Sequence, residues 1–258
     1  MNLLGNRNVF IVVGAVILVV AASFCIPAKE RKGNGGIMLQ FVNCIGDSLV
    51  RLDSSLYKNS YGQDYSINRI RYYIGNIKLY TKDGKEGYAS HEYFLIDEDG
   101  SSPNTCYLDV DPLKNYTSIS FIIGVDSIHN CSGTQSGALD PVHGMFWAWN
   151  TGYVFFKMDG KASSSKSSGN MLEFHIGGYK YPNNCIREVS LNLNDNDIHI
   201  MHDGYGIIVI KADIGKVFNS VNKIDFSKIS TVTDFHNATT IADNYKDMFS
   251  ILKIKDEK

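Results

Sequence analysis

The chain contains 258 residues, of which 44% are hydrophobic and 20% are charged, and its formal net charge at pH 7 is −2. This near balance of charge, and the lack of a basic patch with interleaved aromatic residues, exclude nucleic acid as an expected partner. The sequence also lacks the phosphate-binding loop, the dinucleotide-binding motif, the zinc-protease motif and the G-x-S-x-G elbow, so we predict that the protein is not an enzyme.

Residues 1–28 have the features of an export signal. Arg7 is the only charged residue before an apolar run over residues 9–26, and small residues occur within that run at Ala21 and Ala22. Cys25 adds the possibility of a lipid-modified N-terminus, although a bulky residue precedes it. The run is also long enough to cross a bilayer, so an uncleaved membrane anchor is the alternative. In each case we expect the rest of the chain to be exported to the periplasm or cell envelope.

Residues 29–36 form a charged, glycine-containing linker, and residues 37–258 are long enough for one β domain. Tyrosine and phenylalanine are abundant, proline is sparse and glycine-containing turns recur, which favours strands. We therefore predict a mainly β fold, a single antiparallel β-sandwich with one or two short C-terminal helices. The expected strands are residues 36–42, 66–81, 93–97, 118–125, a pair within 144–158, 172–176, 189–193 and 205–212, and the expected helices are residues 213–218 and 240–249.

The stretch 124–160 contains both tryptophans, Trp147 and Trp149, and begins with a glycine-rich polar loop. Between residues 144 and 158 the positions of both parities are apolar, which is typical of a strand buried on both faces. The pattern predicts a core hairpin containing buried Trp147 and Phe155. The alternative is an exposed aromatic platform that binds a glycan, a peptide or a partner protein without metal, and such a platform requires exposed rings.

Histidines are the candidate chemical groups. Leu172, Phe174 and Ile176 alternate with Glu173 and His175, so His175 is expected to point away from the apolar face of its strand. A histidine in that position is available as a metal ligand or as an ordinary surface residue. His199 and His202 are three residues apart, which on a strand places them on opposite faces and argues against a shared metal.

Several motifs resemble those of the MbnP-type copper-binding proteins, the methanobactin-associated family, and in particular its Bacteroidetes-like branch. Within the central stretch they are residues 124–127, 132–133, 135–141, 144–147, 149–150, 152–153 and Lys157. Outside it they are residues 72–76 with Leu79, 93–97, 174–178, 241–245 and 248–249. The resemblance extends from about residue 36 to residue 251 and implies an exported β-sandwich that binds copper.

The resemblance implies that two histidines bind Cu(I), for copper acquisition or storage. His175 lies in a shared Phe-His-Ile-Gly motif and is the best-supported ligand, and His91, near the shared motif at residues 93–97, is the expected second ligand. Some members also use a tryptophan that a partner dihaem, peroxidase-like enzyme oxidises to kynurenine. This sequence contains no Trp-x-His, so the resemblance does not assign that role to Trp147 or Trp149.

Four cysteines follow Cys25, and in an exported protein they allow two disulfides with three connectivities. Cys131 and Cys185 each border a motif shared with the family, so we expect these two to pair and Cys44 to pair with Cys106. The alternative is that some of them are buried free thiols.

Overall fold

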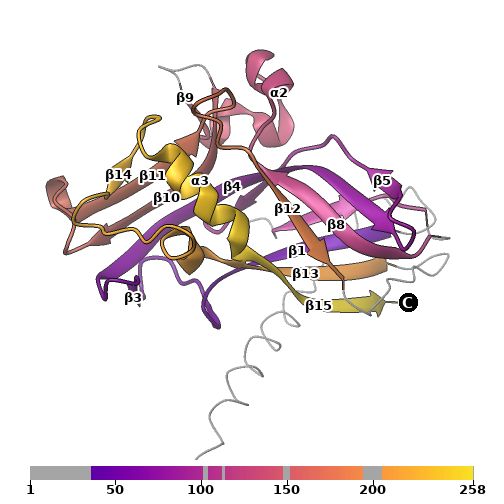
Figure 1. The fold of residues 1–258 in the computed structure, drawn as a ribbon, viewed down its shortest axis with the longest axis horizontal. Coiled ribbons are helices and arrows are strands. Elements are labelled where there is room, and N and C mark those ends of the chain that lie inside the picture. Colours follow the sequence, from indigo (N-terminus) through magenta and orange to yellow (C-terminus); the bar gives the residue numbers. More distant parts are fainter. Residues whose placement is uncertain (1–35, 101–103, 112–113, 148–151, 194–204, 258) are drawn as a thin grey trace, which may run out of the picture.

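The computed structural model describes residues 36–100, 104–111, 114–147, 152–193 and 205–257, which form two packed β-sheets (Figure 1). The expected targeting segment, Trp149, His199 and His202 lie outside the described residues. Among the described residues, no helix combines the length and the hydrophobicity needed to cross a membrane.

The smaller sheet has β1 at its centre, with β13 and then β15 on one edge. Its strands are β1 (Gly36–Ile45), β2 (Ser48–Leu49), β7 (Thr105–Leu108), β13 (Tyr205–Asp213) and β15 (Phe249–Glu257). β1 and β13 run parallel, while β1 is antiparallel to both β2 and β7. The sandwich is therefore mainly antiparallel, as predicted, but its smaller sheet is built around a parallel pair.

The larger sheet is organised around the long strand β4, Asp64–Thr81, which crosses the whole molecule in Figure 1. One edge of β4 pairs first with β10 and then with β8, and the other edge pairs with β3, β6 and β5. The remaining strands are β3 (Tyr57–Lys58), β5 (Glu86–Ala89), β6 (Phe94–Asp97), β8 (Tyr116–Ile123), β9 (Phe146–Trp147), β10 (Gly152–Ala162), β11 (Met171–Gly177), β12 (Arg187–Asn192) and β14 (Thr231–Val232).

Two irregularities in β4 shift its side-chain alternation. In the pairing with β10, Asp159 faces Arg69, but the next residue, Gly160, faces Ile67. Asn68 of β4 is therefore left without a partner residue on β10. The pairing with β8 shifts between Gly75 and Lys78, where Asn76 has a left-handed φ of 48°. A β-bulge moves all later side chains to the other face, so the strict alternation of this segment in the sequence does not persist along the strand.

The core lies between the two sheets and is rich in aromatic side chains. Phe41 of β1 contacts Tyr72, Phe121 and Phe249 edge-on, with ring centroids 6.5, 5.9 and 6.2 Å apart. Trp147 and Phe155 are 7% and 0% exposed, which confirms that the central stretch is buried. Because Tyr72 points into this core, its neighbours Arg71 and Tyr73 point to the outer face of the larger sheet.

Short helices complete the fold. They are α2 (Ser127–Cys131), η1 (Gly137–Leu139), η2 (Pro141–His143), η3 (Ser168–Asn170), η4 (Ile214–Val217), α3 (Ala238–Tyr245) and η5 (Lys246–Met248). The predicted helix over residues 213–218 is η4, which Asp213 caps by accepting from the N–H of Gly215 at 3.1 Å. The predicted helix over residues 240–249 is divided: it continues from α3 into η5, and Phe249 already begins β15.

The predicted disulfides are wrong for this structure, because all four described cysteines are free thiols. Cys106 pairs with Leu39 of β1 and belongs to the main core, whereas Cys44 is five residues further along β1 and packs with a separate cluster on the other face. Five residues of strand span about 17 Å, far more than a disulfide can bridge. Cys131 is exposed and its thiol donates to Tyr179 Oη at 3.4 Å, while Cys185 is buried.

Candidate metal centre

Charged side chains cover the outer face of the larger sheet where β11, β10, β4 and β6 lie side by side. Cross-strand pairing places His175, Lys157, Arg71 and Asp97 in one row. The next row contains Glu173, Asp159 and Arg69. Residues paired directly across strands point to the same face, so the pleat brings these seven side chains together. The predicted direction of His175, away from the apolar face of its strand, is confirmed here, because Leu172, Phe174 and Ile176 are fully buried on the opposite face.

The imidazole of His175 is held by a carboxylate. Its Nε2 lies 2.6 Å from Asp159 Oδ1, and the other oxygen of that carboxylate lies 3.2 Å from Arg69 Nη1. Burial opposes ionisation of Asp159, but the hydrogen bond and charge of His175, with the charges of Lys157 and Arg69, lower its pKa. When His175 is neutral and donates its Nε2–H to the Asp159 carboxylate, the lone pair of Nδ1 has no partner among the described residues.

Trp147 packs against β11, the strand that carries His175. Gly177 is two residues beyond His175 on β11, and a Cβ at Gly177 would lie 2.8 Å from the ring of Trp147. The absence of a side chain at Gly177 therefore makes room for the indole, which also contacts Phe235, with ring centroids 6.0 Å apart. The glycine of the Phe-His-Ile-Gly motif thus has a packing role, since it lets an aromatic ring lie over β11 two residues from His175.

The turn formed by η2 and Gly144 is fastened onto the same face. Arg71 Nη1 donates to the carbonyl of His143 at 2.9 Å, and Lys157 Nζ donates to the carbonyl of Gly144 at 3.1 Å. His143 in turn has its Nε2 3.0 Å from the carbonyl oxygen of Gly137. Burial, and the positive charges of Arg69 and Arg71, lower the pKa of Lys157 although Asp159 opposes the shift. The turn therefore brings a second histidine to the edge of the His175 face.

His91, the predicted second ligand, is exposed and lies elsewhere. The N–H of the preceding residue, Ser90, donates to the carbonyl of Ile77 at 2.8 Å, which places His91 beside that part of β4. The row that contains His175 crosses β4 at Arg71, six residues away, or about 20 Å along the strand. Since metal–imidazole bonds are about 2 Å long, the structure does not bring His91 and His175 together around one ion.

A second oriented imidazole, which the sequence patterns did not single out, belongs to His129 in α2. Its Nδ1 lies 2.9 Å from Asp126 Oδ1, and Tyr93 donates to Asp126 Oδ2 at 2.8 Å. The rings of Tyr93 and His129 are 4.8 Å apart, centroid to centroid. Burial opposes ionisation of Asp126, but the hydrogen bonds from His129 and Tyr93 lower its pKa. Only the fold reveals this cluster, because Tyr93 and Asp126 are 33 residues apart.

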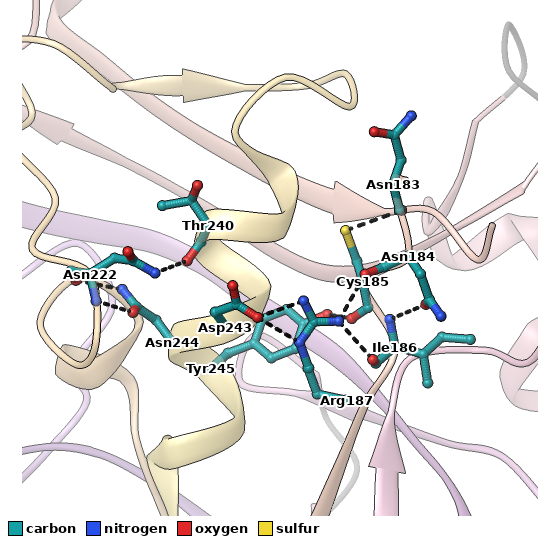
Figure 2. Close-up of polar contacts among 10 residues, drawn as sticks. All are labelled: Asn183, Asn184, Cys185, Ile186, Arg187, Asn222, Thr240, Asp243, Asn244 and Tyr245. Atoms are coloured by element: carbon teal, nitrogen blue, oxygen red, sulfur yellow. Dashed lines mark hydrogen bonds and ion pairs between the residues drawn. The ribbon is translucent and has the colours of Figure 1, made fainter. Parts of the chain in front are cut away.

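One shared motif, residues 241–245, is structural. Figure 2 shows how it holds α3 against the start of β12. Asp243 Oδ1 accepts from Arg187 Nε and Nη2 at 3.0 and 2.7 Å, and Tyr245 donates to the carbonyl of Cys185. Asn244 Nδ2 donates to the carbonyls of Val217 and Asn222 at 2.9 and 2.7 Å. All three polar residues of the motif are thus engaged in holding the helix in place.

The described residues contain no group of three or more histidine, cysteine, aspartate or glutamate side chains arranged to hold a metal ion. What the outer face provides is one imidazole oriented by a carboxylate, a neighbouring indole and a second histidine on a fastened turn. This donor set suits an ion that accepts few ligands and tolerates soft or aromatic neighbours, as Cu(I) does.

Comparison with known protein families assigns the chain to one of them. The MbnP family model matches residues 34–237. Among solved structures, the chain is similar to MbnP from Methylosinus trichosporium, with 12% sequence identity and a TM-score of 0.46 over 74% of this chain and 79% of that chain. The chain has no match among curated proteins. Because the family match covers well over half of the residues, the chain belongs to the MbnP family.

Proposed function

We propose that this protein binds Cu(I) at His175 on the outer face of the larger sheet and that it acts in copper acquisition or storage outside the cytoplasm, without catalysing a reaction. Membership of the MbnP family supports an association with copper or methanobactin. The single observation that carries the proposal is the pair formed by His175 Nε2 and Asp159 Oδ1 at 2.6 Å. Metal-binding histidines commonly donate their second ring N–H to a carboxylate in this way, which fixes the ring and strengthens the ligand.

The residues of the face have separate roles in this proposal. Asp159, kept ionised by its neighbours, orients the His175 ring so that Nδ1 remains available as the ligand atom. Trp147 supplies an aromatic wall, and His143 is the candidate second imidazole because its turn is fastened to Arg71. The side chain of His175 is 19% exposed, so an ion can reach it from solvent. His91 is not included, because the strand register places it far from this face.

A glycan- or peptide-binding platform is less well supported. That alternative requires an exposed tryptophan, whereas Trp147 is only 7% exposed and packs against Gly177 and Phe235. The dihaem partner and the oxidised tryptophan implied by the family resemblance remain predictions, and the intact mass of protein purified from its own host would reveal an oxidised indole.

We expect His175→Ala to abolish stoichiometric Cu(I) binding while leaving the fold intact, because this side chain is outside the core. Competition titration with a chromogenic Cu(I) chelator under anaerobic conditions measures the loss. His91→Ala serves as the matched control, since that side chain is exposed and lies beside a part of β4 that is six residues from the His175 row. Tight binding by His175→Ala would place the site elsewhere, and a parent protein that binds no copper would favour the platform.

Export is a further part of the proposal. We expect the mature protein to begin near residues 23–25, because the apolar run contains small residues just before that point. Mass spectrometry of the N-terminal peptide, from protein recovered with the cell envelope, checks this directly. A lipid on Cys25 would agree with export as a lipoprotein, whereas an intact Met1 on membrane-bound protein would indicate an uncleaved anchor.

A further inference from the structure

His129 presents a ring nitrogen to solvent from a rigid setting. Its side chain is 30% exposed, and no described residue bonds its Nε2. Four contacts hold the residue: Asp126 accepts from both its backbone N–H and its Nδ1, its ring lies against Tyr93, and its carbonyl accepts from Gln135 Nε2 at 2.9 Å. The carboxylate at one nitrogen and the open lone pair at the other form the arrangement expected of a metal ligand.

The loop that follows Asp126 is depleted of charge. Residues 127–144 include no lysine, arginine or glutamate, in a chain of which 20% of residues are charged. Their one carboxylate, Asp140, accepts from the N–H of Val142 at 2.9 Å within the loop. Two large apolar side chains in this loop are nevertheless exposed, Ile128 at 74% and Val142 at 80%. Few charges and exposed apolar residues are characteristic of the centre of a protein–protein interface.

A second copy of this chain is the partner that fits these observations. A twofold interface places the same patch against itself, so unpaired charges near the axis would repel one another. Residues 127–144 contain one carboxylate, Asp140, and the carboxylate of the preceding Asp126 is engaged by His129 and Tyr93. Each copy offers one free imidazole there, and a single imidazole is too few ligands for a bound ion. Two copies supply two neutral imidazoles, which satisfy Cu(I) but not Zn²⁺, whose sites usually have four ligands.

We propose that Cu(I) bridges His129 Nε2 of one chain and the same atom of a second copy, giving a copper-dependent homodimer in which Ile128 packs near the axis. The bridge forms by coordination of two nitrogen lone pairs and involves no change of oxidation state. This site is separate from the His175 face and does not depend on it.

Sedimentation velocity of the full chain, anaerobic and with a thiol-free reductant, tests the bridge with Cu(I) itself as the probe. We expect apo protein to sediment as a monomer and Cu(I)-loaded protein as a dimer, and we expect His129→Gln to remain monomeric with copper. His175→Ala should still dimerise, whereas loss of dimer in that variant, with His129 intact, would overturn the separation of the two sites. A loaded parent that stays monomeric, or a His129→Gln variant that still dimerises, would refute the proposal.

Two further variants exclude simpler explanations. Ile128→Asp leaves the imidazole in place but puts two carboxylates near the twofold axis, so it should weaken the copper-dependent dimer at least tenfold. Cys131→Ser should dimerise as the parent does, and a dimer that disappears in this variant would indicate thiol bridging and not imidazole bridging. Thermal melts of all variants in the apo state verify that His129→Gln and Ile128→Asp fold normally.

Discussion

Replacing Trp147 with alanine is expected to lower the free energy of unfolding by about 3–5 kcal/mol, as is typical for removing a buried aromatic residue. The indole is 7% exposed and occupies the space over Gly177, where a Cβ would lie 2.8 Å from the ring. Its removal leaves a cavity between β9, β11 and Phe235 that the rigid strands cannot close. Urea denaturation followed by far-UV circular dichroism measures the change.

Tyr181→Ala is a suitable control for this experiment, because Tyr181 is also aromatic but is 95% exposed. Its substitution should change the stability by no more than about 0.5 kcal/mol. A cost below about 1 kcal/mol for Trp147→Ala would mean that the ring is on the surface, and the platform interpretation would then be favoured. If copper binds as proposed, Trp147→Ala should also weaken it, because the ring packs over Gly177, two residues along β11 from His175.

The second large effect is expected at Gly160, where the backbones of β10 and β4 approach closely. A Cβ at Gly160 would lie 2.1 Å from the carbonyl oxygen of Ser66, a backbone atom that cannot rotate away. Gly160→Ala must therefore separate the two strands at the bulge, and we expect a loss of about 3 kcal/mol or more. Lys161→Ala, at the exposed neighbouring position, is the control and should be close to neutral.

Gly160 also connects stability to the proposed site. The register shift falls between Asp159 and Gly160, so this bulge determines where the Asp159 carboxylate meets His175 and Arg69. Gly160→Ala should consequently weaken Cu(I) binding as well as stability, whereas Lys161→Ala should change neither. Full copper affinity in a destabilised Gly160→Ala protein would show that the position of Asp159 is not critical.

Local patterns in the sequence were sufficient to predict the β-rich fold, most of the long strands and the outward direction of His175. Each of these depends on alternation within a few residues, which the pleat of a strand converts directly into burial on one face. The apolar residues of both parities around Trp147 likewise predicted a buried hairpin. The family resemblance added an association with copper, and it correctly identified the chain as an MbnP-family member.

Only the tertiary structure decided which distant residues meet. His91 was predicted as the second copper ligand because it is near a shared motif. The structure places it beside Ile77 of β4, six residues along that strand from Arg71 in the His175 row. Cys44 and Cys106 were paired by elimination, yet they occupy different faces of the smaller sheet. The partners of the imidazoles, Asp159 for His175 and Asp126 with Tyr93 for His129, arise from cross-strand pairing and from a loop folded back on the sheet. Such contacts depend on strand register and bulges, which the chemistry of neighbouring residues does not determine.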